Sequence, residues 1–194
     1  MIGLASKPAR RSKEPKLWTY DELCETLPES NQPMELWNGE LLMFPSPDFD
    51  HQRSTLDFYV HLREWVKARD LGEVLAAPFD MVLAPRQVTQ PDVLFIAKAN
   101  LHLIKKVLRG PADLVVEVIS AGSHNRDRIR KRDLYEQHGI KEFWILDSEA
   151  GTVEALFLTD GQYKLVGRWR AGETARSKLL KGFAVEVSKI LPSH

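Results

Sequence analysis

The run DLVVEVIS (113–120) constrains the fold more than any other stretch of the chain, because its β-branched residues suit a strand covered on both faces. By the period-2 rule of strands, Glu117 shares one face with Val115 and Ile119 and interrupts an otherwise apolar surface. A buried carboxylate is costly unless a metal ion, a cation or hydrogen-bond donors accompany it. Such local inconsistencies tend to fall at functional sites, so we expect Glu117 to belong to one.

A second strand carries a second acid. The run QPDVLFIA (90–97) is apolar apart from its first residues, and Asp92 follows a proline of the kind found at the first residue of a strand. Asp92 is a candidate metal ligand together with Glu117. The alternatives are that it caps a turn or pairs with an arginine.

A lysine follows on the next predicted element, a helix that we expect to be capped among residues 123–125 and to stop at Gly139. Asp127, Lys131 and Tyr135 lie at positions i, i+4 and i+8 and form one stripe along this helix. Structural roles also suit each residue. For Asp127 and Lys131 the alternative is an exposed ion pair with each other, and for Tyr135 it is core packing. A further alternative for Lys131 is an ion pair with Glu117 without a metal ion.

Two carboxylates and a lysine suit one class of reaction. Paired carboxylates form a hard-oxygen site of the kind that Mg²⁺ or Mn²⁺ prefers. A metal ion there polarises a phosphodiester and lowers the pKa of bound water. A nearby ammonium orients the nucleophile and stabilises the charge that builds on the phosphate. We therefore expect Asp92, Glu117 and Lys131 to act together on a phosphate ester.

The remaining pattern predicts a mixed central β-sheet flanked by helices, an α/β or α+β fold with an additional N-terminal hairpin. Residues 1–16 are expected to be a disordered basic tail and residues 17–194 a single domain. The hairpin is predicted around Asn38-Gly39, because a type I′ turn requires positive φ at both central residues. The further expected elements are a helix start at Thr19, helices at 51–70 and 98–109, strands at 73–84, 142–147, 153–158 and 162–166, and a last strand at 182–187.

Composition limits the cellular location and the binding partners that we expect for this chain. No apolar run approaches the roughly 20 residues of a membrane span, and the first residues lack the apolar stretch of a secretory signal. The single cysteine, Cys24, excludes an intrachain disulfide, so we expect a cytoplasmic protein. A formal net charge of zero argues against strong non-specific binding of nucleic acid. The basic residues within 7–16 suit either a solvated terminus or an arm that touches DNA.

The ordered combination of PDV, EVIS and RDRIRKRDLYEQHG resembles the Uma-type restriction endonuclease family of the PD-(D/E)XK nuclease superfamily. The resemblance runs from about Met34 to about Val166. It implies a restriction-endonuclease-like fold and Mg²⁺ or Mn²⁺ bound by Asp92, Glu117 and the Val118 backbone carbonyl.

The resemblance also implies further site residues. The superfamily's usual lysine would stand at Ile119, two residues after the acid, whereas the family pattern moves it onto the next helix, at Lys131. Glu35 or Glu40 and His51 match recurrent family positions and are candidate supporting residues. For His51 the structural alternative is a capping or surface residue near a helix start.

Two functions remain open at this level. The first is a metal-dependent endonuclease that hydrolyses DNA. The second is a catalytically inactive nuclease-fold module for interaction or assembly. We also expect a homodimer, formed through the strands at 142–147 and 153–158, and no association with membranes.

Overall fold

The computed structural model describes residues 16–28, 32–119 and 126–192, without the side chains of residues 126–128. None of the helices in these ranges is both long and apolar enough to cross a membrane. The elements, with η for 3-10 helices, are α1 (Tyr20–Thr26), β1 (Met34–Trp37), β2 (Glu40–Met43), α2 (Phe49–Lys67), β3 (Gly72–Ala76), β4 (Met81–Ala84), β5 (Gln87–Thr89), β6 (Val93–Ala97), η1 (Lys98–Leu103), β7 (Leu108–Arg109), β8 (Leu114–Ile119), α3 (Arg126–Gln137), β9 (Glu142–Asp147), β10 (Thr152–Thr159), β11 (Gln162–Arg170), β12 (Thr174–Arg176), β13 (Ala184–Glu186) and η2 (Val187–Lys189).

A six-stranded mixed sheet in the order β11-β10-β9-β8-β6-β3 forms the centre of the molecule. β8 is parallel to β9 and antiparallel to β6, so it is covered on both edges as well as on both faces. Val116 and Val118 pack into one core cluster and Val115 into the other. The predicted alternation therefore holds, and Glu117 shares its face with Val115.

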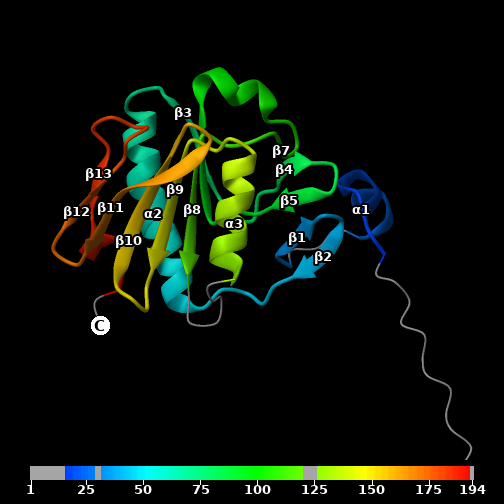
Figure 1. Ribbon diagram of the computed structural model, residues 1–194, viewed down its shortest axis with the longest axis horizontal. Helices are drawn as coiled ribbons and strands as arrows, with labels where there is room; N and C mark the ends of the chain where they lie inside the picture. The colour runs from blue at the N-terminus through cyan, green and yellow to red at the C-terminus, as the bar shows by residue number, and fades with distance from the viewer. Residues whose placement is uncertain (1–15, 29–31, 120–125, 193–194) are drawn as a thin grey trace, which may run out of the picture.

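One helix covers each face of this sheet. Apolar residues of α2 pack on the Val116 face, and Phe58 meets Trp144 edge to face at 5.2 Å. Residues of α3 pack on the opposite face, and Figure 1 shows this helix running alongside β8. Because α3 is short and strongly polar, its buried residues Leu134 and Tyr135 fix its position on the sheet.

A second sheet, in the order β2-β1-β5-β4-β7, lies beside the first. The hairpin at Asn38-Gly39 forms as predicted, with φ of 53° and 89° at the two residues. The chain passes from the first sheet to the second between β3 and β4, at the cis Ala77-Pro78 bond. Trp37 of β1 packs into the same cluster as α3, so the two sheets meet beneath that helix.

The mixed fold with flanking helices is confirmed, but two expectations were wrong. The predicted helix at 98–109 is a 3-10 helix followed by β7, because buried Leu108 pairs with Met81 of β4 instead of continuing a helix. The strands proposed for a dimer surface, now β9 and β10, are inner strands with neighbours on both edges. The edge strands of the sheet are β3 and β11, and the residues of β11 are mostly exposed.

Asp113, the residue before β8, joins that strand to its surroundings. Its buried carboxylate accepts hydrogen bonds from the Ala97 N–H (2.8 Å), the Asn100 amide (2.9 and 3.0 Å) and Lys141 Nζ (2.7 Å). Burial by itself raises the pKa of Asp113, but these hydrogen bonds outweigh burial and hold the pKa below its ordinary value. The ionised carboxylate therefore stabilises the fold.

We expect Asp113→Asn to lower the free energy of unfolding at pH 7 by about 1–3 kcal/mol, because an amide cannot accept from all of these donors. A group with a depressed folded-state pKa stabilises above its unfolded pKa, and this stabilisation is lost as the pH falls through the folded-state pKa. Urea unfolding should therefore show the difference at pH 7 and a smaller one at about pH 3 and below. The exposed Asp133→Asn is the control, and an equal difference at both pH values would contradict the prediction.

Candidate active site

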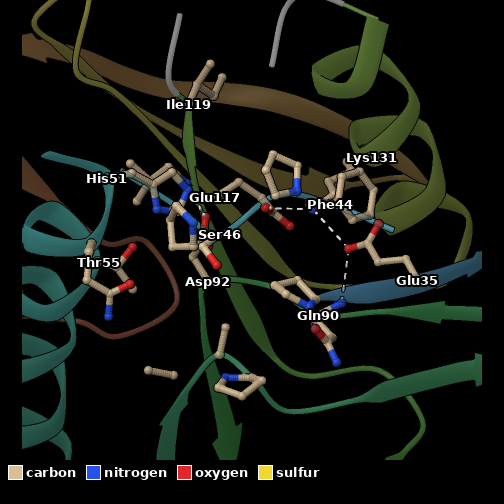
Figure 2. Close-up of a pocket in the computed structure, with 18 of the residues that line it drawn as sticks. Glu35, Phe44, Ser46, His51, Thr55, Gln90, Asp92, Glu117, Ile119 and Lys131 are labelled. Carbon is tan, nitrogen blue, oxygen red and sulfur yellow. Dashed lines mark hydrogen bonds and ion pairs between the residues drawn. The ribbon is translucent and has the colours of Figure 1, made fainter. Parts of the chain in front are cut away.

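A cleft of about 710 Å³ opens where the two sheets, the start of α2 and α3 meet (Figure 2). It is lined by residues of the β2–α2 connection, of α2, of both sheets and of α3. The lining residues are Pro33, Glu35, Trp37, Leu42, Phe44, Pro45, Ser46, Pro47, Asp48, His51, Gln52, Thr55, Leu56, Ala76, Ala77, Pro78, Gln90, Asp92, Glu117, Val118, Ile119, Arg130, Lys131, Phe143 and Ile145.

Strand pairing brings the two acids of the sequence pattern together. β6 and β8 are antiparallel with Val93 opposite Val116, and this register continued by one residue sets Asp92 opposite Glu117. Side chains that stand directly opposite in an antiparallel pair lie on the same face. Both carboxylates line the cleft, on the face that α3 covers.

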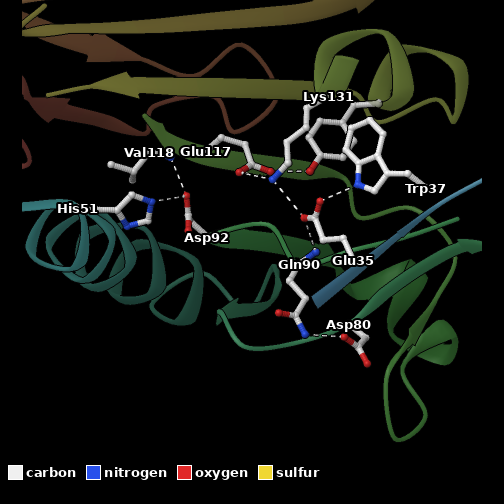
Figure 3. Close-up of polar contacts among 10 residues, drawn as sticks. Glu35, Trp37, His51, Asp80, Gln90, Asp92, Glu117, Val118 and Lys131 are labelled. Atoms are coloured by element: carbon white, nitrogen blue, oxygen red, sulfur yellow. Dashed lines mark hydrogen bonds and ion pairs between the residues drawn. The ribbon is translucent and has the colours of Figure 1, made fainter. Parts of the chain in front are cut away.

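Asp92 is held from two sides. Its Oδ2 accepts a hydrogen bond from the Val118 N–H at 2.7 Å and lies 3.3 Å from His51 Nε2 (Figure 3). In the described part of the chain both contacts fall on Oδ2, so Oδ1 is the oxygen left for a cation. The alternative partner, an arginine, is not what this carboxylate meets.

Glu117 is held from α3. Lys131 Nζ donates to Glu117 Oε2 at 2.8 Å, and the Tyr135 hydroxyl donates to Oε1 at 2.5 Å. Tyr135 is itself fixed by Phe143, whose ring it meets edge to face at 5.3 Å. The predicted stripe of Lys131 and Tyr135 on one helix face is therefore present, and both residues reach the same carboxylate.

Lys131 also lies 3.2 Å from Glu35 Oε1, so one ammonium group bridges two carboxylates (Figure 3). Glu35 is only 4% exposed and accepts two further hydrogen bonds. Its Oε2 accepts from Trp37 Nε1 at 2.7 Å, and its Oε1 accepts from the Gln90 N–H at 3.1 Å. The Gln90 side chain in turn donates to Asp80 at 2.7 Å, which extends the polar chain into the second sheet.

The charges of this cluster do not balance. Three carboxylates, on Glu35, Asp92 and Glu117, face one lysine and one histidine. Burial, opposed by the charge of Lys131 and reinforced by those of Asp92 and Glu35, raises the pKa of Glu117 to about 7. The excess negative charge makes this a place where a further cation is favourable.

The nearby carboxylates also raise the pKa values of the two basic groups, Lys131 and His51. Burial lowers the pKa of Lys131, but the charges of Glu117 and Glu35 outweigh it and raise this pKa well above its ordinary value. Burial also lowers the pKa of His51, and the hydrogen bond and charge of Asp92 reverse that effect and raise it. Lys131 is therefore a fixed positive charge near neutral pH.

The other residues named from the sequence have different places. Of the pair Glu35 and Glu40, only Glu35 lines the cleft, whereas Glu40 is exposed on β2. Val118 lines the cleft and meets Asp92 through its N–H, and its carbonyl as a metal ligand stays a prediction. The Asp127 side chain lies outside the described residues, as does the helix cap expected at 123–125.

Sequence reasoning missed several residues of the cleft. Trp37 stands two residues after Glu35 on the same strand, so a shared face was a usable signal for their contact. Arg130 lies over the Trp37 ring with its guanidinium carbon 4.6 Å from the ring centroid. Gln90 and Phe44 gave no signal, because their places depend on long-range packing.

The donor set suits a hard divalent cation. Among the described residues, no three His, Cys, Asp or Glu side chains form a group that could hold a metal ion by themselves. Mg²⁺ is usually bound through one or two carboxylates and keeps several waters, so the pair Asp92 and Glu117 meets its requirement. The excess negative charge of the cluster acts in the same direction.

The comparisons with known proteins agree with one another. The family model described as "Uma2: Putative restriction endonuclease" matches residues 19–188. Five chains among the solved structures match, and one is described as a putative nuclease belonging to DUF820 from Anabaena variabilis ATCC 29413. That structure aligns with a TM-score of 0.74 at 14% identity, over 89% of this chain and 96% of its own. No curated protein sequence matches.

We expect Lys131→Met to lower the free energy of unfolding by up to about 3–5 kcal/mol, because it leaves two buried carboxylates without their shared cation. Combining it with Glu117→Gln should recover part of this loss, since one of the unpaired charges is then removed. Chemical unfolding of the two single variants and the double variant measures the coupling. Additive effects of the two changes would contradict the bridge described above.

Proposed function

The chain belongs to the Uma2 family of putative restriction endonucleases, and from this premise we propose that it is a metal-dependent nuclease that hydrolyses phosphodiester bonds in DNA. The observation that supports the proposal most directly is the convergence of Asp92, Glu117 and Lys131 in one cleft. These residues come from two adjacent strands and a helix, in the order of the sequence pattern.

In this proposal Asp92 and Glu117 hold Mg²⁺ or Mn²⁺, and the Val118 carbonyl is a further candidate ligand. The bound ion would supply Lewis-acid polarisation of the phosphate and a water of lowered pKa. His51 and the Val118 N–H fix the orientation of Asp92. Tyr135 fixes that of Glu117.

Lys131 supplies a charge that does not require the metal. Its ammonium remains protonated beside two carboxylates, so it can orient a nucleophilic water and stabilise negative charge on the phosphate. Glu35 provides a second partner that keeps Lys131 in the cleft when Glu117 is otherwise engaged. Glu35 is therefore a positioning residue in this proposal.

One observation favours a second candidate, a nuclease-fold module without catalysis. Both oxygens of Glu117 are engaged, one by Lys131 and one by Tyr135, so the cluster holds together through protein contacts alone. Such a module needs no metal, and the two experiments below separate it from the enzyme. A homodimer and a cytoplasmic location stay predictions of the sequence.

We expect Mg²⁺ or Mn²⁺ to raise the melting temperature of the unaltered protein, because binding to the folded state alone stabilises it by mass action. Asp92→Ala and Glu117→Gln should show a smaller rise or none. Differential scanning fluorimetry over a series of metal concentrations gives the comparison, with Asp133→Asn as the control. Equal shifts in all four proteins would remove Asp92 and Glu117 as ligands.

We expect Asp92→Ala to lower metal-dependent cleavage of plasmid DNA by about 10² or more, the usual size for loss of a group that stabilises developing charge. Glu35→Gln should also lower the rate, because it weakens the hold on Lys131. Glu40→Gln is the matched control, since this exposed acid lies five residues away in the same hairpin. Cleavage that persists unchanged in Asp92→Ala would mean that another site or a contaminant is responsible.

A further inference from the structure

One wall of the cleft is apolar and stiff. It is formed by residues 44–47, Phe-Pro-Ser-Pro, which connect β2 to α2 and carry no charge. Each proline fixes its own φ, so this wall is largely set before any ligand arrives. In the view of Figure 2, Phe44 lies on the side of Glu35 and Lys131, while His51 and Asp92 lie on the other side.

The rest of the lining is also apolar away from the acids. Ala76, Ala77 and Pro78 line the cleft at the end of β3, and Phe143 and Ile145 line it from β9. Apolar surface of this kind is well suited to the flat face of a ring system. The volume of about 710 Å³ lies within the range of about 300–1,000 Å³ found for ligand pockets.

The charged lining is poor in available cations. Besides His51, the lining contains four acidic and two basic residues. One of the two basic residues, Lys131, already forms ion pairs with Glu35 and Glu117. Within the described part of the chain, Arg130 is the lining cation that no carboxylate engages, and it lies over the ring of Trp37. A guanidinium stacked on an indole presents both a flat surface and a positive charge to a ligand.

These features suit one form of nucleic acid better than another. A protein that grips a duplex neutralises many phosphates with lysine and arginine, which this lining does not offer. An unpaired nucleotide instead exposes the faces of its base, which stack on aromatic side chains or fit between apolar ones. The phosphate beside it requires few cations, and the lining contains two, Arg130 and Lys131.

We propose that the cleft takes up an unpaired nucleotide of the strand to be cut, so that the preferred substrate is single-stranded or locally unpaired nucleic acid. The inference rests on the proposed nuclease function and names its substrate class. Phe44 supplies the stacking surface, and Arg130 on Trp37 supplies a cation for the neighbouring phosphate or base.

The test compares binding of one fluorescently labelled DNA sequence as a single strand and as a duplex, with Ca²⁺ in place of Mg²⁺. We expect the single strand to bind at least about tenfold more tightly at equal salt. Phe44→Ala should weaken single-strand binding about tenfold, the usual size for loss of one stacked base, and leave duplex binding nearly unchanged. Phe44→Trp should retain the affinity.

The matched control is Leu165→Ala, which removes an apolar side chain that is 55% exposed on β11 and outside the cleft lining. It should change neither affinity, and circular dichroism checks the fold of each variant. Equal affinity for the two forms, an equal loss in both with Phe44→Ala, or no binding of the single strand overturns the inference.

Cleavage assays separate this inference from the proposed function. If duplex is cut in a manner that depends on Asp92 while single strands are not cut, the nuclease function stands and the inference falls. If single strands bind through Phe44 but no nucleic acid is cut with Mg²⁺ or Mn²⁺, the binding inference stands and the catalytic proposal falls.

Discussion

The ammonium group of Lys131 is the charged contact that joins three elements at one point, beside the apolar cluster that they share. It contacts Glu117 of β8 in the central sheet and Glu35 of β1 in the second sheet, and it belongs to α3. Because a buried charge must be compensated, none of the three groups can move away from the others without cost. The same contact thus contributes both to the placement of the second sheet and to the charge of the cleft.

Much of the core of the site could be predicted from local patterns. The two acids in apolar strands, and the lysine and tyrosine on one helical stripe, required only the periodicities of strand and helix. Glu35 and Glu40 could not be told apart in this way. Trp37 pairs with Glu40 and Glu35 pairs with Leu42, so both acids share one face of the hairpin. Which end of that face meets α3 depends on the pairing of β1 with β5, which is not local.

The wrong prediction of a helix at 98–109 also arises from strand pairing that is not local. Its apolar residues fit a helical spacing, but Leu108 is fully buried where β7 joins the second sheet. Local pattern predicted the β1–β2 hairpin of the second sheet but not its pairing with β5, because strands that pair across about 50 residues leave no periodic signal of their partners. Local pattern therefore identified which residues are unusual, and tertiary pairing decided which of them meet.

Burial of an acid is not sufficient to identify a site in this protein. Glu142 is fully buried, and it accepts hydrogen bonds from Trp144 Nε1 (2.6 Å) and from the N–H groups of Lys178 (3.0 Å) and Leu179 (2.5 Å). It thereby ties the start of β9 to the C-terminal segment. Glu117 differs because other carboxylates surround it and because it borders open space. Crowding of like charges beside a cleft, and not burial, distinguishes the two.

The exposed edge strand β11 has a consequence for the behaviour of the protein at high concentration. A free edge invites pairing with another copy, and β11 carries Lys164, Arg168 and Arg170 along its length. Antiparallel self-pairing centred on Val166 would set Lys164 opposite Arg168, and centring on Gly167 would set it opposite Arg170. Like charges directly opposite are unfavourable, so this edge resists the sheet-to-sheet growth that leads to aggregation.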